Sequence, residues 1–94
     1  MTYIIKFSKQ PKLYIVTTQD KMTAFDFIKM AEDLLNDPNY VAGSNGVFDH
    51  RNLIIDDVPY EDLTKIRNFH MKNGNRIGAG RCAMIVKSVL AWNE

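Results

Sequence analysis

The fold is decided by residues 23–38, TAFDFIKMAEDLLNDP, where apolar side chains recur with the period of an α-helix. The positions on one helical face are Ala24, Phe27, Ile28, Ala31, Leu34 and Leu35. Thr23 can cap the helix by accepting a hydrogen bond from the backbone N–H of Asp26. Pro38 ends it, because the residue before a proline avoids helical angles. We therefore predict a helix between Thr23 and Pro38.

Two apolar residues of this segment, Phe25 and Met30, lie outside that face. They could form a surface for a partner, or they could be exposed apolar residues of the kind that most protein surfaces carry. The sequence leaves both explanations open.

Two strands precede the helix. Residues 3–7 and 13–18 are rich in β-branched and aromatic side chains, as strands are. The polar connection between them contains Pro11, which cannot donate a hydrogen bond within a sheet and so belongs in a turn. We predict a β-hairpin.

After the helix come a loop over residues 39–45 and a short strand, Val47-Phe48-Asp49, which we expect to end at Asp49. Pro59 then suits the start of a second helix, and Gly74 suits the position just past its end. The stripe on this helix consists of Tyr60, Leu63, Ile66, Phe69 and His70. Residues 81–86, RCAMIV, are expected to form a buried strand.

The predicted order is β-β-α-β-α-β. Strands that are separated by helices need crossover connections, so the fold class is an α/β sandwich. We expect a four-stranded mixed sheet with two main helices packed on it. Residues 1–94 should form a single domain, since a second core would have too little surface to bury.

Composition excludes several classes of protein. The chain is 46% hydrophobic and 24% charged, as is ordinary for a globular domain. No apolar run approaches the roughly 18 residues that a membrane span needs, so no transmembrane segment is expected. The N-terminus lacks the features of a signal peptide, which favours a cytoplasmic location. The one cysteine, Cys82, cannot form an internal disulfide and should be a small buried hydrophobe.

The net charge of +1 conceals an uneven distribution. Residues 1–17 carry +3, residues 18–62 carry −7, residues 63–93 carry +6 and Glu94 carries −1. Such segregation can give one basic and one acidic face, each complementary to a partner. The alternative is that the segments neutralise one another when the chain folds.

The stretch from Asp49 to Asp57 gathers the groups that could do chemistry, namely Asp49, His50, Arg51, Asp56 and Asp57. A metal site needs three or four convergent ligands, and acid–base catalysis needs a pocket and a shifted pKa. The only other histidine, His70, lies on an apolar helix stripe. We therefore expect a solvated strand exit, with no metal, no cofactor and no catalytic set.

Gly74, Gly78 and Gly80 suggest a phosphate-binding loop, but such loops follow a strand and open a helix. Here the order is reversed, so a helix cap and a turn are favoured. The basic run from Lys65 to Lys87 contains Phe69, yet the chain as a whole is far from strongly basic. No nucleic-acid partner is expected.

Four segments together resemble the SpoIIAA-like branch of the STAS domains: LLNDPNY (34–40), GVFDHR (46–51), YEDL (60–63) and RCAMIV (81–86). The resemblance covers most of the chain and implies a STAS-type α/β fold, which is akin to the SEC14-like lipid-binding architecture. Well-known members are anti-anti-sigma factors, which bind a partner kinase and are switched by phosphorylation of a serine at the start of the helix after the central strand.

This chain departs from the family in two ways. Residues 50–60 contain no serine or threonine, with Asp56 or Asp57 in the neighbourhood instead, so a phosphorylation switch would have to use Tyr60 or Thr64. Relatives also continue past the last strand with another helix and strand, whereas Leu90-Ala91-Trp92 looks like the shortened beginning of such an element. We therefore expect a homodimer or higher homo-oligomer that uses Leu90 and Trp92.

The function expected from the sequence is a non-enzymatic STAS-like module that binds a protein partner. The expected partner-binding residues are Asp49, His50, Arg51, Asp56, Asp57, Tyr60, Glu61 and Thr64. The alternative is a small-ligand or lipid-binding domain of the SEC14-like type. Its apolar pocket would be lined by Phe27, Met30, Phe48, Phe69 and Met84, although each of these could equally be a core residue.

Overall fold

The computed structural model describes residues 1–55 and 58–87 and confirms the α/β class and the predicted order of elements. The elements are β1 (Thr2–Lys9), β2 (Lys12–Lys21), α1 (Ala24–Asn36), β3 (Gly46–Ile54), α2 (Tyr60–Lys72), α3 (Gly74–Ile77) and β4 (Cys82–Ile85). The one-turn helix α3 is an addition to the prediction. Asp56, Asp57, Leu90 and Trp92, which carry several of the predicted contacts, lie outside the described residues.

The four strands form one mixed sheet in the order β1-β2-β3-β4. β1 and β2 pair antiparallel around the turn at Gln10-Pro11, as predicted, while β2, β3 and β4 run parallel. The register aligns Val16 with Phe48 and Phe48 with Met84, so these side chains form a row on one face. That row points toward the helices and is called the inner face here.

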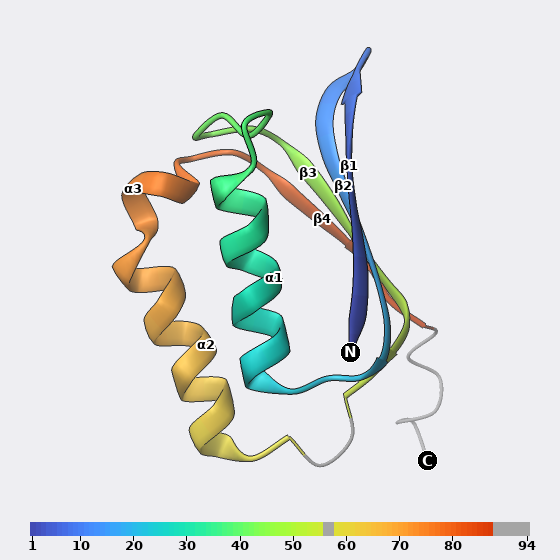
Figure 1. Ribbon diagram of the computed structural model, residues 1–94, viewed down its shortest axis with the longest axis vertical. Helices are drawn as coiled ribbons and strands as arrows, with labels where there is room; N and C mark the ends of the chain where they lie inside the picture. The colour runs from blue at the N-terminus through green and yellow to red at the C-terminus, as the bar shows by residue number, and fades with distance from the viewer. Residues whose placement is uncertain (56–57, 88–94) are drawn as a thin grey trace.

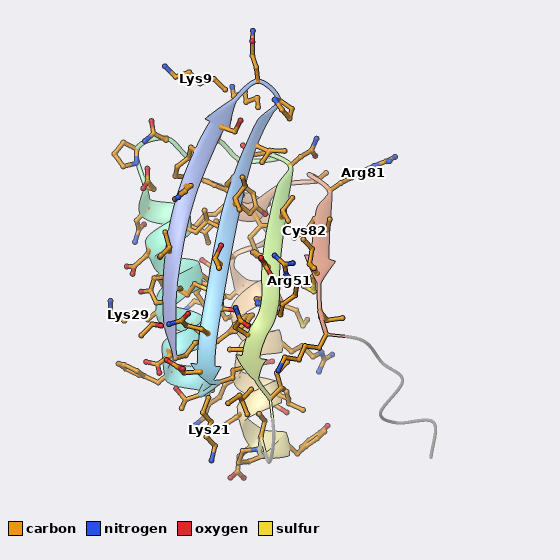
Figure 2. The ribbon with its side chains drawn as sticks, turned by 90° about the vertical axis from the view of Figure 1, so that its right-hand side faces the viewer. Lys9, Lys21, Lys29, Arg51, Arg81 and Cys82 are labelled. Carbon is orange, nitrogen blue, oxygen red and sulfur yellow. The ribbon has the colours of Figure 1, made fainter. Side chains whose placement is uncertain are left out.

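All three helices lie on the same side of the sheet (Figure 1). The reason is topological: from β2 to β3 to β4 each crossover moves to the next position in the same direction. Right-handed crossovers of this kind place their helices on one face. No described helix or loop covers the other face, which Figure 2 views directly.

The core lies between the hairpin and α1. Its buried members are Tyr14, Val16, Met30 and Leu34, with Tyr3, Ile5 and Phe7 of β1 packed against them. Thr23 caps α1 as predicted, accepting a hydrogen bond of 3.1 Å from the backbone N–H of Asp26.

The placement of Met30 corrects the predicted face of α1. Met30 is only 1% exposed, whereas Phe25 is 77% exposed. α1 contacts the sheet on one side and α2 on another, so its apolar surface is wider than a single stripe. Met30 and Leu34 face the sheet. Ile28 instead lines a groove between α1 and α2, together with Asp62 and Lys65 of α2.

Strand β3 is longer than predicted. It continues past Asp49 to Ile54, and it pairs with Gln19 to Lys21 of β2 after a bulge at which His50 and Arg51 oppose Thr18. Burial of Leu53 explains the continuation, since this apolar side chain anchors the second half of the strand. The stretch predicted to be a solvated strand exit is therefore largely strand.

The expectation of a buried last strand was wrong. All four residues of β4 are exposed, including Cys82, because β3 is the one described strand that pairs with β4 and helix α2 packs against α1 rather than directly on the sheet. None of the helices in the described ranges combines the length and apolar character that a membrane span requires.

The glycines near the end of α3 allow two loops to approach closely. The backbone N–H of Gly43 donates to the carbonyl oxygen of Ile77 at 2.9 Å. A Cβ on Gly78 would lie 2.3 Å from the nitrogen of Gly43, and Gly78 has a φ of +75°, which favours glycine. Gly78 is the C-cap of α3, whereas Gly74, which was expected to follow the end of α2 as its cap, is the first residue of α3.

Candidate functional site

A cavity of about 440 Å³ lies between the inner face of the sheet and the helices. All five residues predicted for an apolar pocket line it: Phe27 and Met30 from α1, Phe48 from β3, Phe69 from α2 and Met84 from β4. The remaining lining residues are Tyr14, Ala31, Leu34, Leu35, Tyr40, Ile66, His70, Ile77 and Cys82. The cavity exists because α2 packs on α1 and so stands away from β3 and β4.

Three aromatic rings build one wall of this cavity. The ring of Tyr14 packs at a tilt against Tyr40 and Phe48, with centroid separations of 5.9 and 5.7 Å. Gly46 makes room for them, since a Cβ there would lie 2.1 Å from the ring of Tyr14. The position of the Tyr14 ring in this wall therefore depends on a glycine at position 46.

Few polar atoms line the cavity, and most of them already contact another group of the protein. The hydroxyl of Tyr40 donates to the carbonyl oxygen of Ile77 at 2.9 Å, and the hydroxyl of Tyr14 approaches the Sγ of Cys82 at 4.0 Å. Burial raises the pKa of both tyrosines, so they stay neutral at physiological pH. The cavity therefore presents apolar surface with few polar groups and no buried charge.

His70 is a polar residue of the cavity lining that is also exposed to solvent. Its Nδ1 lies 3.0 Å from the carbonyl oxygen of Ile66, so Nδ1 must carry the donated proton. In that tautomer Nε2 is an acceptor. His70 is exposed and also lines the cavity, which marks it as a group that a ligand's polar end could meet.

The predicted partner-binding residues are not brought together by the described structure. His50 is buried on the inner face, while Asp49 and Arg51 point to the outer face and pair at 2.7 Å. Hydrogen bonds from Arg51 lower the pKa of Asp49 to about 2. Side chains alternate between the two faces of a β-strand, so these residues lie on opposite faces although they are adjacent in the sequence.

The other described members of that set lie at the start of α2. Tyr60 is 83% exposed, Glu61 is also exposed, and the hydroxyl of Thr64 donates back to the carbonyl oxygen of Tyr60 at 3.1 Å. They form a separate patch from Asp49 and Arg51.

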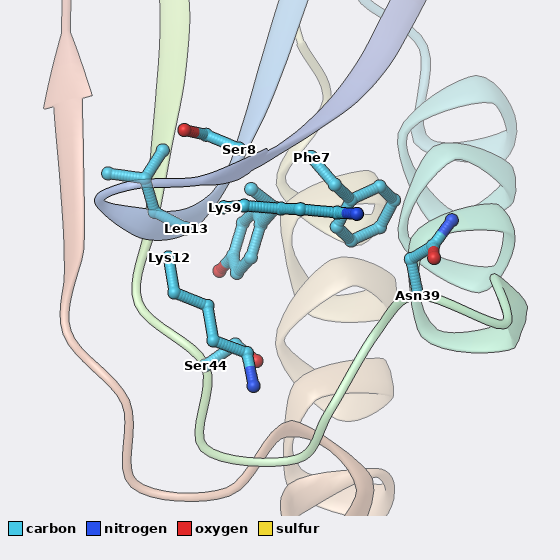
Figure 3. A pocket seen from close by; sticks show the side chains of 8 residues that line it. Phe7, Ser8, Lys9, Lys12, Leu13, Asn39 and Ser44 are labelled. Carbon is cyan, nitrogen blue, oxygen red and sulfur yellow. The ribbon is translucent and has the colours of Figure 1, made fainter.

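A second hollow, of about 360 Å³, lies at the tip of the hairpin (Figure 3). Lys9 and Lys12 reach into it from β1 and β2, beside Asn39 and Ser44 from the loop after α1. Both lysines are exposed, and within the described residues neither forms an ion pair. It is a surface hollow in which the described side chains form no set of converging catalytic or ligand-binding groups.

Sequence reasoning missed several cavity residues, chiefly Tyr14, Tyr40, His70 and Ile77. The sequence pattern did indicate the position of Tyr14, because it lies two and four residues before Val16 and Thr18 on the same strand and so shares their inward face. Tyr40 and Ile77 meet only through the contact of two loops, which no local pattern reports.

Within residues 1–55 and 58–87, no three histidine, cysteine or carboxylate side chains are placed to hold a metal ion. Comparison of the chain with protein-family models, with curated proteins and with solved structures finds no match.

Proposed function

We propose that this chain is a non-enzymatic binding domain whose cavity takes an apolar ligand, such as a lipid chain. The observation that carries the proposal is the convergence of Phe27, Met30, Phe48, Phe69 and Met84 on one cavity of about 440 Å³. Pockets for small molecules commonly measure about 300–1,000 Å³ and are lined mainly by apolar and aromatic groups.

This space is open to solvent beside β4, where Met84 is 64% exposed and Cys82 is exposed, so it is an apolar hollow and not part of the packed core. Apolar surface that is left in contact with water is unfavourable. An apolar ligand would restore the missing contacts, and the two methionines can adapt their shape to it. His70, at the exposed side, would meet the ligand's polar end.

The resemblance to the STAS and SEC14-like proteins supports the same class of ligand. It also supports the second candidate function, a module that binds a protein partner. The specific observation in its favour is the start of α2, where Tyr60 is 83% exposed and Leu63 is 48% exposed. Exposed tyrosines of this kind are enriched at protein interfaces. Self-association through Leu90 and Trp92 belongs to this second candidate.

The first test is native mass spectrometry of the purified chain, followed by titration of the ligand-free protein with straight-chain fatty acids of graded length. We expect retained mass or saturable binding, with an optimum chain length set by the cavity. Met84→Trp should fill the cavity and weaken binding at least tenfold. Met71→Trp is the matched control, since Met71 is exposed on α2 and does not line the cavity.

The proposal fails if fatty acids of every length bind without saturation, or if both tryptophan variants bind like the original chain. A homodimer without extra mass and without fatty-acid binding would favour the interaction module instead.

A further inference from the structure

The polar groups that line the cavity gather at one of its ends. The register of the sheet places Tyr14 and Cys82 on either side of the first residue of β3. Tyr40 follows α1 and Ile77 ends α3, and these segments lie at the same end of the sheet, where β3 and β4 begin (Figure 1). His70 is in the last turn of α2, shortly before α3. This end of the cavity is called the polar end here.

The rest of the lining is apolar. Phe48 and Met84 are partners in the register two residues further along β3 and β4. Phe27 lies in the first half of α1 and Ile66 in the middle of α2, both away from α3. A ligand chain that follows these residues would therefore lie along β3 and β4 with its polar group at the polar end.

The strong hydrogen-bond donors of the polar end are already engaged within the protein. Nδ1 of His70 donates to the carbonyl oxygen of Ile66 at 3.0 Å, and the hydroxyl of Tyr40 donates to that of Ile77 at 2.9 Å. The hydroxyl of Tyr14 is directed at the cysteine sulfur at 4.0 Å. The polar end therefore offers a ligand mainly acceptors, above all Nε2 of the exposed His70.

No lysine or arginine of the described chain lines the cavity. Arg76 of α3 is held by Glu32 at 3.4 Å and by Asn36 at 2.7 Å. Arg67, one turn before His70 on α2, is exposed and is not a lining residue. An ionised carboxylate accepts hydrogen bonds and cannot donate one, so at the polar end it would face acceptors without a balancing charge.

We infer that the ligand of this cavity is a neutral lipid whose polar group is a hydroxyl, and that this hydroxyl donates a hydrogen bond to Nε2 of His70. This ligand class rests on the proposed function, because the same cavity takes the apolar chain. His70 then selects a hydroxyl over a carboxylate, while Phe48, Met84 and the other apolar residues hold the chain.

The test compares a straight-chain primary alcohol with its methyl ether and with the fatty acid of equal chain length, at pH 8. Imidazoles are ordinarily neutral at this pH and carboxylic acids are ionised. Each ligand is titrated into the full chain loaded with N-phenyl-1-naphthylamine, a neutral apolar dye whose fluorescence falls when it is displaced. We expect the alcohol to bind about three- to tenfold more tightly than the fatty acid, since the hydroxyl makes a hydrogen bond that the carboxylate does not.

One variant tests the role of His70. His70→Phe removes Nε2 but keeps an aromatic ring in the lining, and it should lower the ratio of alcohol affinity to ether affinity about three- to tenfold. Met71→Phe is the matched control and should leave the ratio unchanged, because Met71 is 68% exposed and does not line the cavity. A general loss of stability would weaken both ligands alike and would not change the ratio.

An unchanged ratio in His70→Phe would overturn the inference, as would a fatty acid that binds the original chain as tightly as the alcohol. Either result would leave the apolar-ligand function standing, because the cavity would still take the chain. No displacement of the dye by any of these ligands would reject that function itself, and the selection of a hydroxyl with it.

Discussion

Nδ1 of His50 lies 2.7 Å from Oγ1 of Thr18, across two neighbouring strands. Thr18 is completely buried and its hydroxyl donates to the carbonyl oxygen of Asp49 at 3.3 Å, so the histidine supplies the proton between the two side chains. The rings of Phe27 and Phe48 flank the imidazole at centroid distances of 6.1 and 5.6 Å. A histidine that sequence proximity assigned to a recognition surface is thus part of the folded interior.

The stability of the fold should fall as the pH falls through the range of histidine titration. Burial lowers the pKa of His50 below its usual value, against a smaller opposing effect of Asp49. The unfolded chain therefore binds the proton first, and the stabilisation present above about pH 6.5 is lost as the pH falls toward the folded pKa. Urea denaturation between about pH 5 and pH 7 measures this, since ordinary carboxylates stay ionised there.

The control for this prediction is His70→Gln, which removes an exposed histidine and should leave the pH dependence in place. His50→Gln should flatten it. A chain whose free energy of unfolding is constant over this range would contradict the buried position of His50.

Gly46→Ala should destabilise the protein by about 1–3 kcal/mol, the usual cost of forcing an extra methyl group into a packed site. The new Cβ would lie 2.1 Å from the ring of Tyr14, which would have to move out of its stack with Tyr40 and Phe48. Gly74→Ala is the matched control, because a Cβ at Gly74 meets nothing within 4 Å. Thermal denaturation should show a lowered Tm for the first variant only.

Met30→Ala should cost about 2–5 kcal/mol of unfolding free energy, as truncations of buried methionines and leucines do. Met30 is 1% exposed, whereas Met71 on α2 is 68% exposed. Met71→Ala should therefore change the stability by less than about 0.5 kcal/mol. Similar losses in the two variants would contradict the assignment of Met30 to the core.

Cys82 should react with a thiol reagent such as DTNB in the native state, because the residue is exposed on β4. It also lines the cavity, so a bound fatty acid should slow the reaction. A reaction that requires denaturant would contradict the exposed position of Cys82. An unchanged rate at saturating fatty acid would place that ligand elsewhere.

The parts of the fold that local interactions control were predictable. The cap at Thr23, the period of α1 and the turn at Pro11 depend on residues within a few positions of one another, and all three are present. The order of strands and helices followed from them. The five residues predicted for an apolar pocket line one cavity, although Met30 was expected to lie off the inward face of α1, and ligand binding there stays a prediction.

What tertiary structure alone decided is which side each residue faces and what lies opposite. The same-direction crossovers put every described helix on one face of the sheet, and Met30 of α1 is buried against that face. Because β3 continues past Asp49, side-chain alternation along it places His50 on the inner face and its neighbours Asp49 and Arg51 on the outer face. The packing of α2 on α1 left Cys82 exposed and opened the cavity. The physical reason is that burial depends on contacts between elements distant in the chain, while periodicity and capping are properties of a single segment.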